Sequence, residues 1–198
     1  SDDKLLVASG RSVPAVYDRH TGECLYFNAD TKRGGYEVYV SNGYFLNDDR
    51  LHVMSDGGYV WPTTATVLDG RAMYSTDETG LIQAESLTLT WRSIRDRKGK
   101  TKKQAEFKTL WKRQGDPLLE KIFIKAGSRL YAGGGSGLIA AIDIPSEKAE
   151  AVQRGAKPPK ADVSWSMQIE GEPWTMLAAD NKLFVVTVEG SMYCFGDT

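Results

Sequence analysis

The chain has 198 residues, of which 25 are Lys or Arg, 26 are Asp or Glu and 41% are hydrophobic, and its net charge is −1. These values predict one ordinary folded domain or two small ones, and they exclude a disordered tail and a globally basic nucleic-acid binder. No apolar stretch approaches the ~18 residues of a membrane-spanning helix. Two cysteines, Cys24 and Cys194, cannot by themselves make a disulfide scaffold or a four-ligand zinc site.

A short pattern recurs five times along the chain. Each copy has a basic residue, an apolar strand, a turn of small residues and a second strand. The turn residue follows an apolar residue of the first strand at an offset of seven. Another apolar run precedes most copies, and a strand with an aromatic residue follows. Such spacing predicts a four-stranded antiparallel meander. The copies begin at Lys4, Arg50, Arg71, Arg129 and Lys182.

Four-stranded units at intervals of about 40 to 50 residues are typical of β-propeller blades. We therefore predict an all-β propeller of about four to five blades, some incomplete, that occupies residues 1–198 as a single segment. The short interval from Arg50 to Arg71 indicates a truncated second unit. The first copy lacks a leading strand and the last lacks a fourth, so we expect a piece of a longer propeller or an atypical small one.

The repeats resemble the pyrroloquinoline-quinone-type (PQQ-like) propeller family. The best match is AVYDRHTG, with Asp18, Thr21 and Gly22 at the motif positions, while Asp143 begins a degraded copy. We assign Asp18 to accept backbone N–H groups across its turn, and Gly22 to adopt a positive φ. Trp111 and Trp165 end fourth strands, and we expect the tryptophans to pack between blades.

Enzymes of this family hold PQQ over a tryptophan and bind calcium through Glu, Asn and Asp. The sequence has no recognisable version of that constellation, so we predict no catalytic, cofactor-binding or metal-binding residue. Asp56, Asp77 and Glu78 are interpreted as turn residues rather than calcium ligands. The histidines His20 and His52 are isolated from any metal-binding or catalytic pattern. For Cys24 and Cys194 we favour two buried free thiols over a disulfide.

The segment from Trp91 to Arg113 departs from the repeats. It carries a local charge of +8, which leaves −9 for the remainder of the chain. Its alternating arms predict a long β-hairpin with a cationic tip, built from the outer strands of two consecutive units. Either the lysines only guard an exposed edge, or the tip binds an anionic partner, which would be an acidic protein surface, a phospholipid face or nucleic acid. Base readout is disfavoured because the tip lacks interleaved aromatic residues. The candidate contacts are Arg97, Lys98, Lys100, Lys102 and Lys103.

We expect a non-enzymatic binding or scaffolding module of a larger bacterial protein that contacts a protein partner or a neighbouring domain. The family resemblance implies a periplasmic or other extracytoplasmic location. One alternative is a fragment of a quinoprotein-like oxidoreductase, for which PQQ and calcium would be the cofactors. Others are an accessory propeller beside a methyltransferase-like domain, and a small-ligand or carbohydrate binder using Tyr59, Trp61 and Trp174. Specific nucleic-acid binding and a membrane span are not expected, and the oligomeric state stays open.

Overall fold

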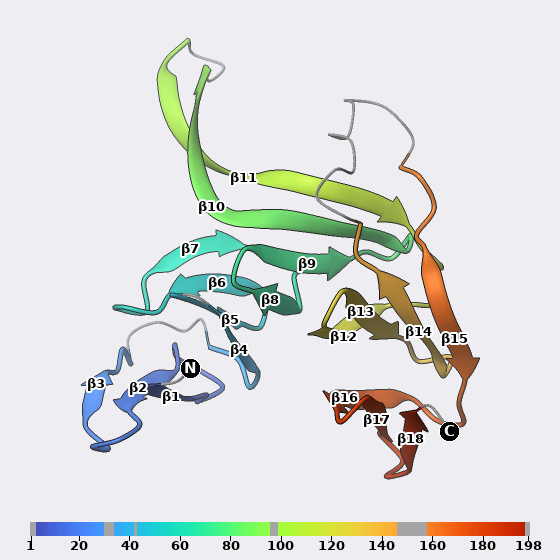
Figure 1. Ribbon diagram of the computed structural model, residues 1–198. Helices are drawn as coiled ribbons and strands as arrows, with labels where there is room; N and C mark the ends of the chain where they lie inside the picture. Colours follow the sequence, from blue (N-terminus) through green and yellow to red (C-terminus); the bar gives the residue numbers. More distant parts are fainter. Residues whose placement is uncertain (1–2, 30–33, 42, 96–98, 146–157, 197–198) are drawn as a thin grey trace. The chain divides into compact units, whose positions relative to one another are not determined.

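The computed structural model describes residues 3–29, 34–41, 43–95, 99–145 and 158–196, except the side chains of Lys102, Gln104 and Ala105. These residues form five antiparallel sheets of three or four strands and contain no helix (Figure 1). The predicted fold class, an all-β chain of β-propeller blades, is therefore confirmed, with one blade per sheet. Within the described ranges, no helix is long and apolar enough to cross a membrane.

Two compact units make up the chain, Ser1–Gly70 and Arg71–Thr198, and each is described by itself. The N-terminal unit contains the first sheet, in the order β1-β2-β3, and the second, in the order β4-β5-β6-β7. Its core is formed by Val13, Phe45 and Met54, against which Leu6 and Val38 pack. The strands are β1 (Lys4–Val7), β2 (Ala15–Asp18), β3 (Cys24–Tyr26), β4 (Val38–Ser41), β5 (Tyr44–Asn47), β6 (Arg50–Val53), β7 (Tyr59–Pro62) and β8 (Val67–Asp69).

The C-terminal unit contains the fourth sheet, in the order β12-β13-β14-β15, and the fifth, in the order β16-β17-β18. The third sheet has the order β11-β10-β9-β8, and only its strand β8 falls in the N-terminal range. Strand β12 contacts both β9 and β16, so the three sheets follow one another within this unit. The strands are β9 (Ala72–Thr76), β10 (Leu81–Arg95), β11 (Thr101–Gln114), β12 (Lys121–Ala126), β13 (Arg129–Gly133), β14 (Leu138–Asp143), β15 (Val163–Gln168), β16 (Pro173–Ala179), β17 (Lys182–Thr187) and β18 (Met192–Gly196).

The strands form where apolar residues alternate with others, because successive side chains of a strand point to opposite faces. In β17, Leu183, Val185 and Thr187 are buried while the residues between them are more exposed. Tight turns then reverse the chain. Between β16 and β17, Asp180 and Asn181 both adopt positive φ angles of 49° and 57°, as expected for an Asx pair in a two-residue hairpin.

A register shift recurs between the last two strands of a sheet, counted in chain order. It is found in the first four sheets, between β2 and β3, β6 and β7, β10 and β11, and β14 and β15. One extra residue on the last strand creates such a β-bulge, which increases the local twist. An aromatic residue of the last strand stands beside each bulge, and these residues are Tyr26, Trp61, Trp111 and Trp165.

The strand order shows that the predicted alignment of the second unit is wrong. Arg50 opens β6, which is the third strand of its sheet, whereas Arg129 and Lys182 open second strands. The second sheet therefore has four strands and is not truncated. The short interval from Arg50 to Arg71 arises because the two residues mark different strands of their sheets.

The prediction for the basic segment also needs a correction. Its two arms lie in β10 and β11, which are neighbours in the third sheet, rather than in outer strands of two consecutive units. The hairpin is therefore an extension of a single blade.

Replacement of Phe45 by Ala tests the core of the N-terminal unit. Phe45 is fully buried and stacks on His52 with a ring-centroid distance of 5.0 Å. We expect Phe45→Ala to lower the free energy of unfolding by about 3–5 kcal/mol, since the cavity cannot close completely. Urea unfolding followed by circular dichroism measures this loss. Phe27→Ala is the matched control because Phe27 is 54% exposed, and equal losses in the two variants would contradict the assigned core.

Candidate docking surface

The hairpin of β10 and β11 is the longest feature of the C-terminal unit. Its strands have 15 and 14 residues. Only the base of β10, from Ile82 to Ser86, also pairs with β9. Register shifts at Ala84, Glu85 and Leu89 separate this base from the outer arms, and Figure 1 shows the hairpin bending away in its middle. The outer arms thus form a two-stranded ribbon that projects from the sheet.

The base of the hairpin is anchored by buried apolar side chains. Leu87, Phe107 and Trp111 are each 6–7% exposed. Trp111 also packs on Tyr74 of β9, with 6.1 Å between ring centroids. Because the base is buried in this way, the outer arms need contribute little to the core and are available for polar residues.

One face of the ribbon combines an exposed tryptophan with cations. Residues directly opposite in an antiparallel pair share a face, and the register places Trp91 opposite Ala105, Ser93 opposite Lys103 and Arg95 opposite Thr101. Trp91 is 64% exposed, and Arg95 and Lys103 are exposed as well. We call Trp91, Arg95 and Lys103 the Trp91 face.

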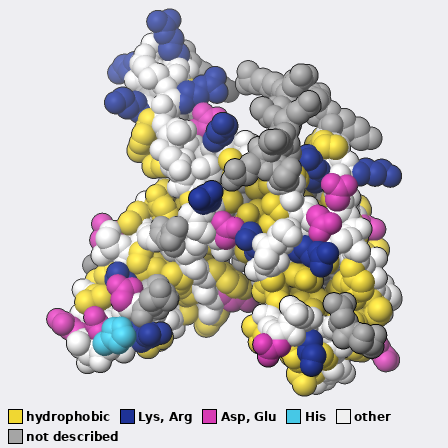
Figure 2. Space-filling model, in the orientation of Figure 1, with side chains coloured by type: hydrophobic (Ala, Val, Ile, Leu, Met, Phe, Trp, Pro, Cys, Tyr) yellow, Lys and Arg dark blue, Asp and Glu magenta, His cyan; other side chains and the backbone are white. Residues whose placement is uncertain are grey.

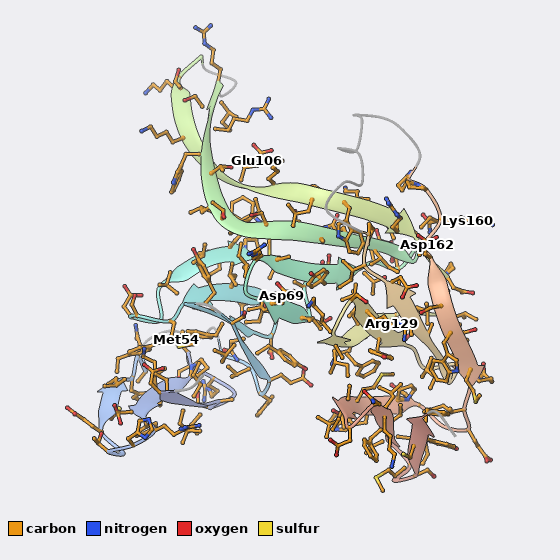
Figure 3. The ribbon with its side chains drawn as sticks, viewed as in Figure 1. Met54, Asp69, Glu106, Arg129, Lys160 and Asp162 are labelled. Carbon is orange, nitrogen blue, oxygen red and sulfur yellow. The ribbon has the colours of Figure 1, made fainter. Side chains whose placement is uncertain are left out.

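The opposite face of the ribbon differs in charge. Glu106 lies there opposite Thr90, whose hydroxyl donates to the Glu106 backbone oxygen at 2.8 Å, and Arg92 is on the same side. Figure 3 labels Glu106 on these arms. The Glu106 carboxylate therefore lies on the side away from the Trp91 face. The described charged residues of the Trp91 face, Arg95 and Lys103, are both positive.

The predicted contact residues are only partly visible. Lys100 and Lys103 are described and exposed, and Figure 2 shows Lys and Arg side chains gathered over the hairpin arms. Arg97 and Lys98 lie outside the described residues, as does the side chain of Lys102. Sequence reasoning did not predict Trp91 as a contact residue. The strand segment LTWRSIR places Trp91, Ser93 and Arg95 at alternate positions, and this alternation could have indicated that they share a face.

The prediction that the tryptophans pack between blades is only partly confirmed. Trp165 of the fourth sheet contacts Phe195 of the fifth, with 5.0 Å between ring centroids. Trp91 and Trp174, in contrast, are each 64% exposed. Of the other residues considered for a small-ligand site, Tyr59 and Trp61 belong to β7 and Trp174 belongs to β16.

The residues matching the family motif form a hydrogen-bonded turn. The Asp18 carboxylate accepts the backbone N–H groups of His20 at 2.8 Å and Thr21 at 2.7 Å. The Thr21 bond and the His20 bond hold the pKa of Asp18 below its ordinary value. Gly22 has a φ of 77°. Asp143 stands at the register position of Asp18 and accepts a hydrogen bond from Arg129 at 3.0 Å.

Two of the three acidic residues considered for calcium, Asp56 and Asp77, lie in turns that their own side chains cap. Asp56 accepts the Gly58 N–H at 2.8 Å, and Asp77 accepts the Thr79 hydroxyl at 2.7 Å. Among the described residues, no three His, Cys, Asp or Glu side chains are grouped so as to hold a metal ion. The geometry thus assigns these carboxylates a local role in turn formation.

The histidines and cysteines have different surroundings. His20 is exposed, whereas His52 is 1% exposed and its Nδ1 lies 3.0 Å from the Gly57 carbonyl oxygen. Cys24 and Cys194 are free thiols, and both are exposed rather than buried as predicted.

A groove of about 880 Å³ follows the boundary of the fourth and fifth sheets. Tyr131, Trp165 and Phe195 supply its aromatic surface, and Arg129 and Lys182 supply cations. The hydrogen bond from Arg129 to Asp143 raises the pKa of the guanidinium above its ordinary value. This groove lies where the two sheets pack together, and Arg129 at its edge is held by Asp143.

Together, the repeated four-stranded meanders define the chain as a protein of the β-propeller class. No protein-family model matches it, and no curated protein does. The computationally designed Ika8 protein matches 100% of this chain and 56% of its own, with 11% identity and a TM-score of 0.59. The chain thus spans little more than half the length of that structure, and the likeness concerns the fold alone.

Two natural proteins have weaker likenesses. BamB from Moraxella catarrhalis matches 97% of this chain and 69% of its own, with 12% identity and a TM-score of 0.48. Hsv2 from Kluyveromyces lactis matches 99% and 82%, with 8% identity and a TM-score of 0.46.

Replacement of Asp77 by Asn tests the carboxylate-capped turn. The Thr79 hydroxyl is the main cause of the lowered Asp77 pKa, and the Leu81 N–H contributes at 3.0 Å. A lowered folded-state pKa stabilises the fold above the unfolded value of 3.8, and this stabilisation is lost as the pH falls through the folded value. We expect Asp77→Asn to be less stable than wild type at neutral pH, with the difference shrinking below pH 3.8. Urea midpoints across this pH range measure it.

Asp162→Asn, at an exposed aspartate before β15, is the control for this pH series. A difference between Asp77→Asn and wild type that persists unchanged at low pH would show that the carboxylate charge does not stabilise the turn.

Proposed function

We propose that the chain is a non-enzymatic propeller module that docks an acidic protein surface on the Trp91 face of its projecting hairpin. The observation that carries the proposal is the exposure of Trp91, Arg95 and Lys103 on one face of a ribbon whose base is buried. Propeller folds commonly mediate protein interactions, and tryptophan and arginine are enriched among the residues that dominate protein interfaces.

The chemistry of the face favours a protein over the other anionic partners. A nucleic-acid strand is held by several stacked aromatic residues, whereas this face has one tryptophan. A segment that lies in a membrane interface buries a broad apolar face, whereas this face presents Arg95 and Lys103 beside a single tryptophan. A single aromatic anchor surrounded by cations fits an acidic protein surface with one apolar recess.

The PQQ-like character of the repeats and an extracytoplasmic location in a bacterium belong to this proposal too. They are supported by the motif AVYDRHTG and by the turn that Asp18, Thr21 and Gly22 form. In this proposal the motif residues stabilise the blade and take no part in catalysis.

Neutralising the hairpin cations tests the docking surface. We expect the combined change Arg95→Gln, Lys100→Gln and Lys103→Gln to weaken binding of a fluorescein-labelled polyglutamate peptide about tenfold at low salt, since each lost ion pair costs up to about 1 kcal/mol. Fluorescence anisotropy measures the dissociation constant. The charge-matched control, Lys125→Gln, Lys160→Gln and Lys182→Gln, changes three lysines outside the outer arms of the hairpin and should bind like wild type.

Trp91→Ala separates the aromatic anchor from the charges. It should also weaken binding, by about fivefold or more, but leave the dependence on salt unchanged because no charge is removed. Wild-type affinity in both the Gln variant and Trp91→Ala would overturn the docking surface. Tighter binding to phosphatidylglycerol vesicles or single-stranded DNA than to the peptide would overturn an acidic protein as the partner.

A further inference from the structure

The fourth sheet ends in an edge strand that is open to solvent. Strand β15 is the last strand in the order β12-β13-β14-β15, and within the described residues it pairs only with β14 (Figure 1). All of its residues except Trp165 are exposed, including Val163 at 47% and Met167 at 43%. An edge strand presents a row of backbone N–H and C=O groups that can pair with another extended segment.

The hydrogen bonds of the sheet show which backbone groups of β15 point outward. Just after the strand, the Ile169 N–H donates to the Gly137 carbonyl oxygen at 3.0 Å, on the side of β14. The backbone groups of successive residues point to alternate sides of a strand, so Trp165 and Met167 also direct theirs toward β14. The N–H and C=O groups of Ser166 and Gln168 therefore point away from the sheet.

Strand β15 lacks the side chains that protect other edge strands of this chain. Proline and lysine on an edge strand hinder the addition of another strand. In the second sheet β7 ends in Pro62, and in the third sheet β11 contains Lys108 and Lys112. The sequence of β15, VSWSMQ, contains neither a charged residue nor a proline. No charge or proline ring of β15 thus opposes an incoming strand.

The third sheet shows that an edge strand of this chain pairs with a further segment. At the last residue of β11, the Gln114 N–H donates to the Pro159 carbonyl oxygen, and the Ala161 N–H donates to the Gln114 carbonyl oxygen, both at 2.8 Å. Lys160 forms a parallel bridge with Gln114 in this way. The chain itself therefore uses backbone pairing at the edge of a neighbouring sheet.

A groove adjoins β15 on one face of the sheet. Trp165 and Met167 line the groove of about 880 Å³ between the fourth and fifth sheets, together with Tyr131, Leu183 and Phe195. Both sheets belong to the C-terminal unit. The volume lies within the range of about 300–1,000 Å³ that is usual for ligand pockets. The aromatic lining of the groove suits apolar side chains.

The edge and the groove are related by the geometry of a sheet. Residues that lie opposite each other on neighbouring strands have their side chains on the same face. The residues of an added strand that lie opposite Trp165 and Met167 would therefore direct their side chains to the groove face. The residues between them would point to the other face. A peptide with apolar residues at alternate positions thus fits both features.

We propose that β15 binds an extended peptide of a partner protein, which adds to the fourth sheet as a further strand and places alternate apolar side chains in the groove. The outward donors and acceptors of Ser166 and Gln168 favour a peptide backbone over a small apolar ligand, which could not pair with them. No charged residue of β15 attracts an acidic segment, so this partner is chemically distinct from the one on the Trp91 face. The inference is independent of the hairpin.

Replacement of Ser166 tests the backbone pairing. The probe is a fluorescein-labelled peptide of alternating threonine and phenylalanine, as long as β15, and fluorescence anisotropy measures its dissociation constant. We expect Ser166→Pro to weaken binding about tenfold or more, because proline removes an outward N–H and its ring hinders an incoming strand. The fold should tolerate this proline, since it lies on an edge strand with its nitrogen toward solvent. Ser166→Ala keeps the N–H and should bind like wild type.

A wild-type chain that does not bind the peptide at about 1 mM, a very weak affinity, would overturn the proposal. Wild-type affinity of Ser166→Pro would also overturn it.

The peptide backbone provides a test that needs no variant of the chain. Only every second N–H of an added strand faces its neighbour. N-methylation of all the threonines and N-methylation of all the phenylalanines should therefore differ, with one modified peptide binding about tenfold or more weakly than the other. Equal affinities of the two modified peptides would show that the peptide backbone does not pair with β15.

Hydrogen exchange of the backbone amides locates the peptide on the chain. In the free chain, the Ser166 and Gln168 amides should exchange faster than those of Trp165 and Met167, which point toward β14. Saturating peptide should slow exchange at Ser166 and Gln168 about tenfold or more. Slow exchange at both in the free chain would mean that a segment of this chain already covers the edge, which overturns a partner peptide as the occupant. Fast exchange that persists with bound peptide would overturn β15 as the site.

A charge on either face of β15 tests the groove. Met167→Asp places a carboxylate on the groove face and should weaken binding about tenfold, because an apolar side chain then meets a charge. Ser166→Asp places the same charge on the opposite face and should bind like wild type. Equal affinities of these two variants would overturn the role of the groove.

The hairpin variant with Arg95→Gln, Lys100→Gln and Lys103→Gln should bind this uncharged peptide like wild type, so the two binding surfaces are tested separately. Circular dichroism of every variant distinguishes lost binding from lost folding.

Discussion

The contact between the apolar faces of consecutive small sheets is the interaction on which this protein depends. A single sheet of three or four short strands leaves the apolar residues of both its faces in water unless something packs on them, and exposed apolar surface is unfavourable. Its strands alternate apolar residues between two faces, so each sheet needs a covering on both sides. The contact of Trp165 with Phe195 above Leu183 shows how one sheet completes the next. The propeller architecture follows from repeating this contact.

The same constraint explains why the cationic hairpin is compatible with the fold. Leu87, Phe107 and Trp111 satisfy the burial requirement at its base, and the register shifts near Glu85 then turn the ribbon away from the sheet. Beyond that bend the strands have no covering sheet within the described residues, so most of their described side chains are exposed to solvent. Positive charge is concentrated there without any cost to the core.

Much of the blade structure was predictable from the sequence because local patterns produce it. Alternation in KLFVVT and turn pairs such as Asp180 and Asn181 determine strands and hairpins over a few residues. The alignment at Arg50 failed because second and third strands of a blade have similar alternation. Only strand pairing, with the bulge beside Trp61, shows that β6 is a third strand.

Exposure was the property that sequence patterns predicted least well. Trp91, Trp111, Trp165 and Trp174 are all tryptophans of strands, and the sequence does not distinguish them. Trp91 and Trp174 are nevertheless open to solvent, whereas Trp111 is buried. Likewise, Cys24 and Cys194 lie in apolar strands but are exposed, because burial depends on whether another sheet covers that face. Such coverage is a long-range property that no local window contains.

The sequence by itself determined the all-β class, the repeated meander, the turn of Asp18 and Gly22, and the separation of a +8 segment from a −9 remainder. Those features depend on side-chain chemistry within a few residues. The tertiary structure alone decided that the hairpin belongs to one sheet, that Trp91 shares a face with Arg95 and Lys103, and that Trp165 packs on the fifth sheet. These features depend on strand pairing and sheet stacking, which bring together residues that are distant along the chain.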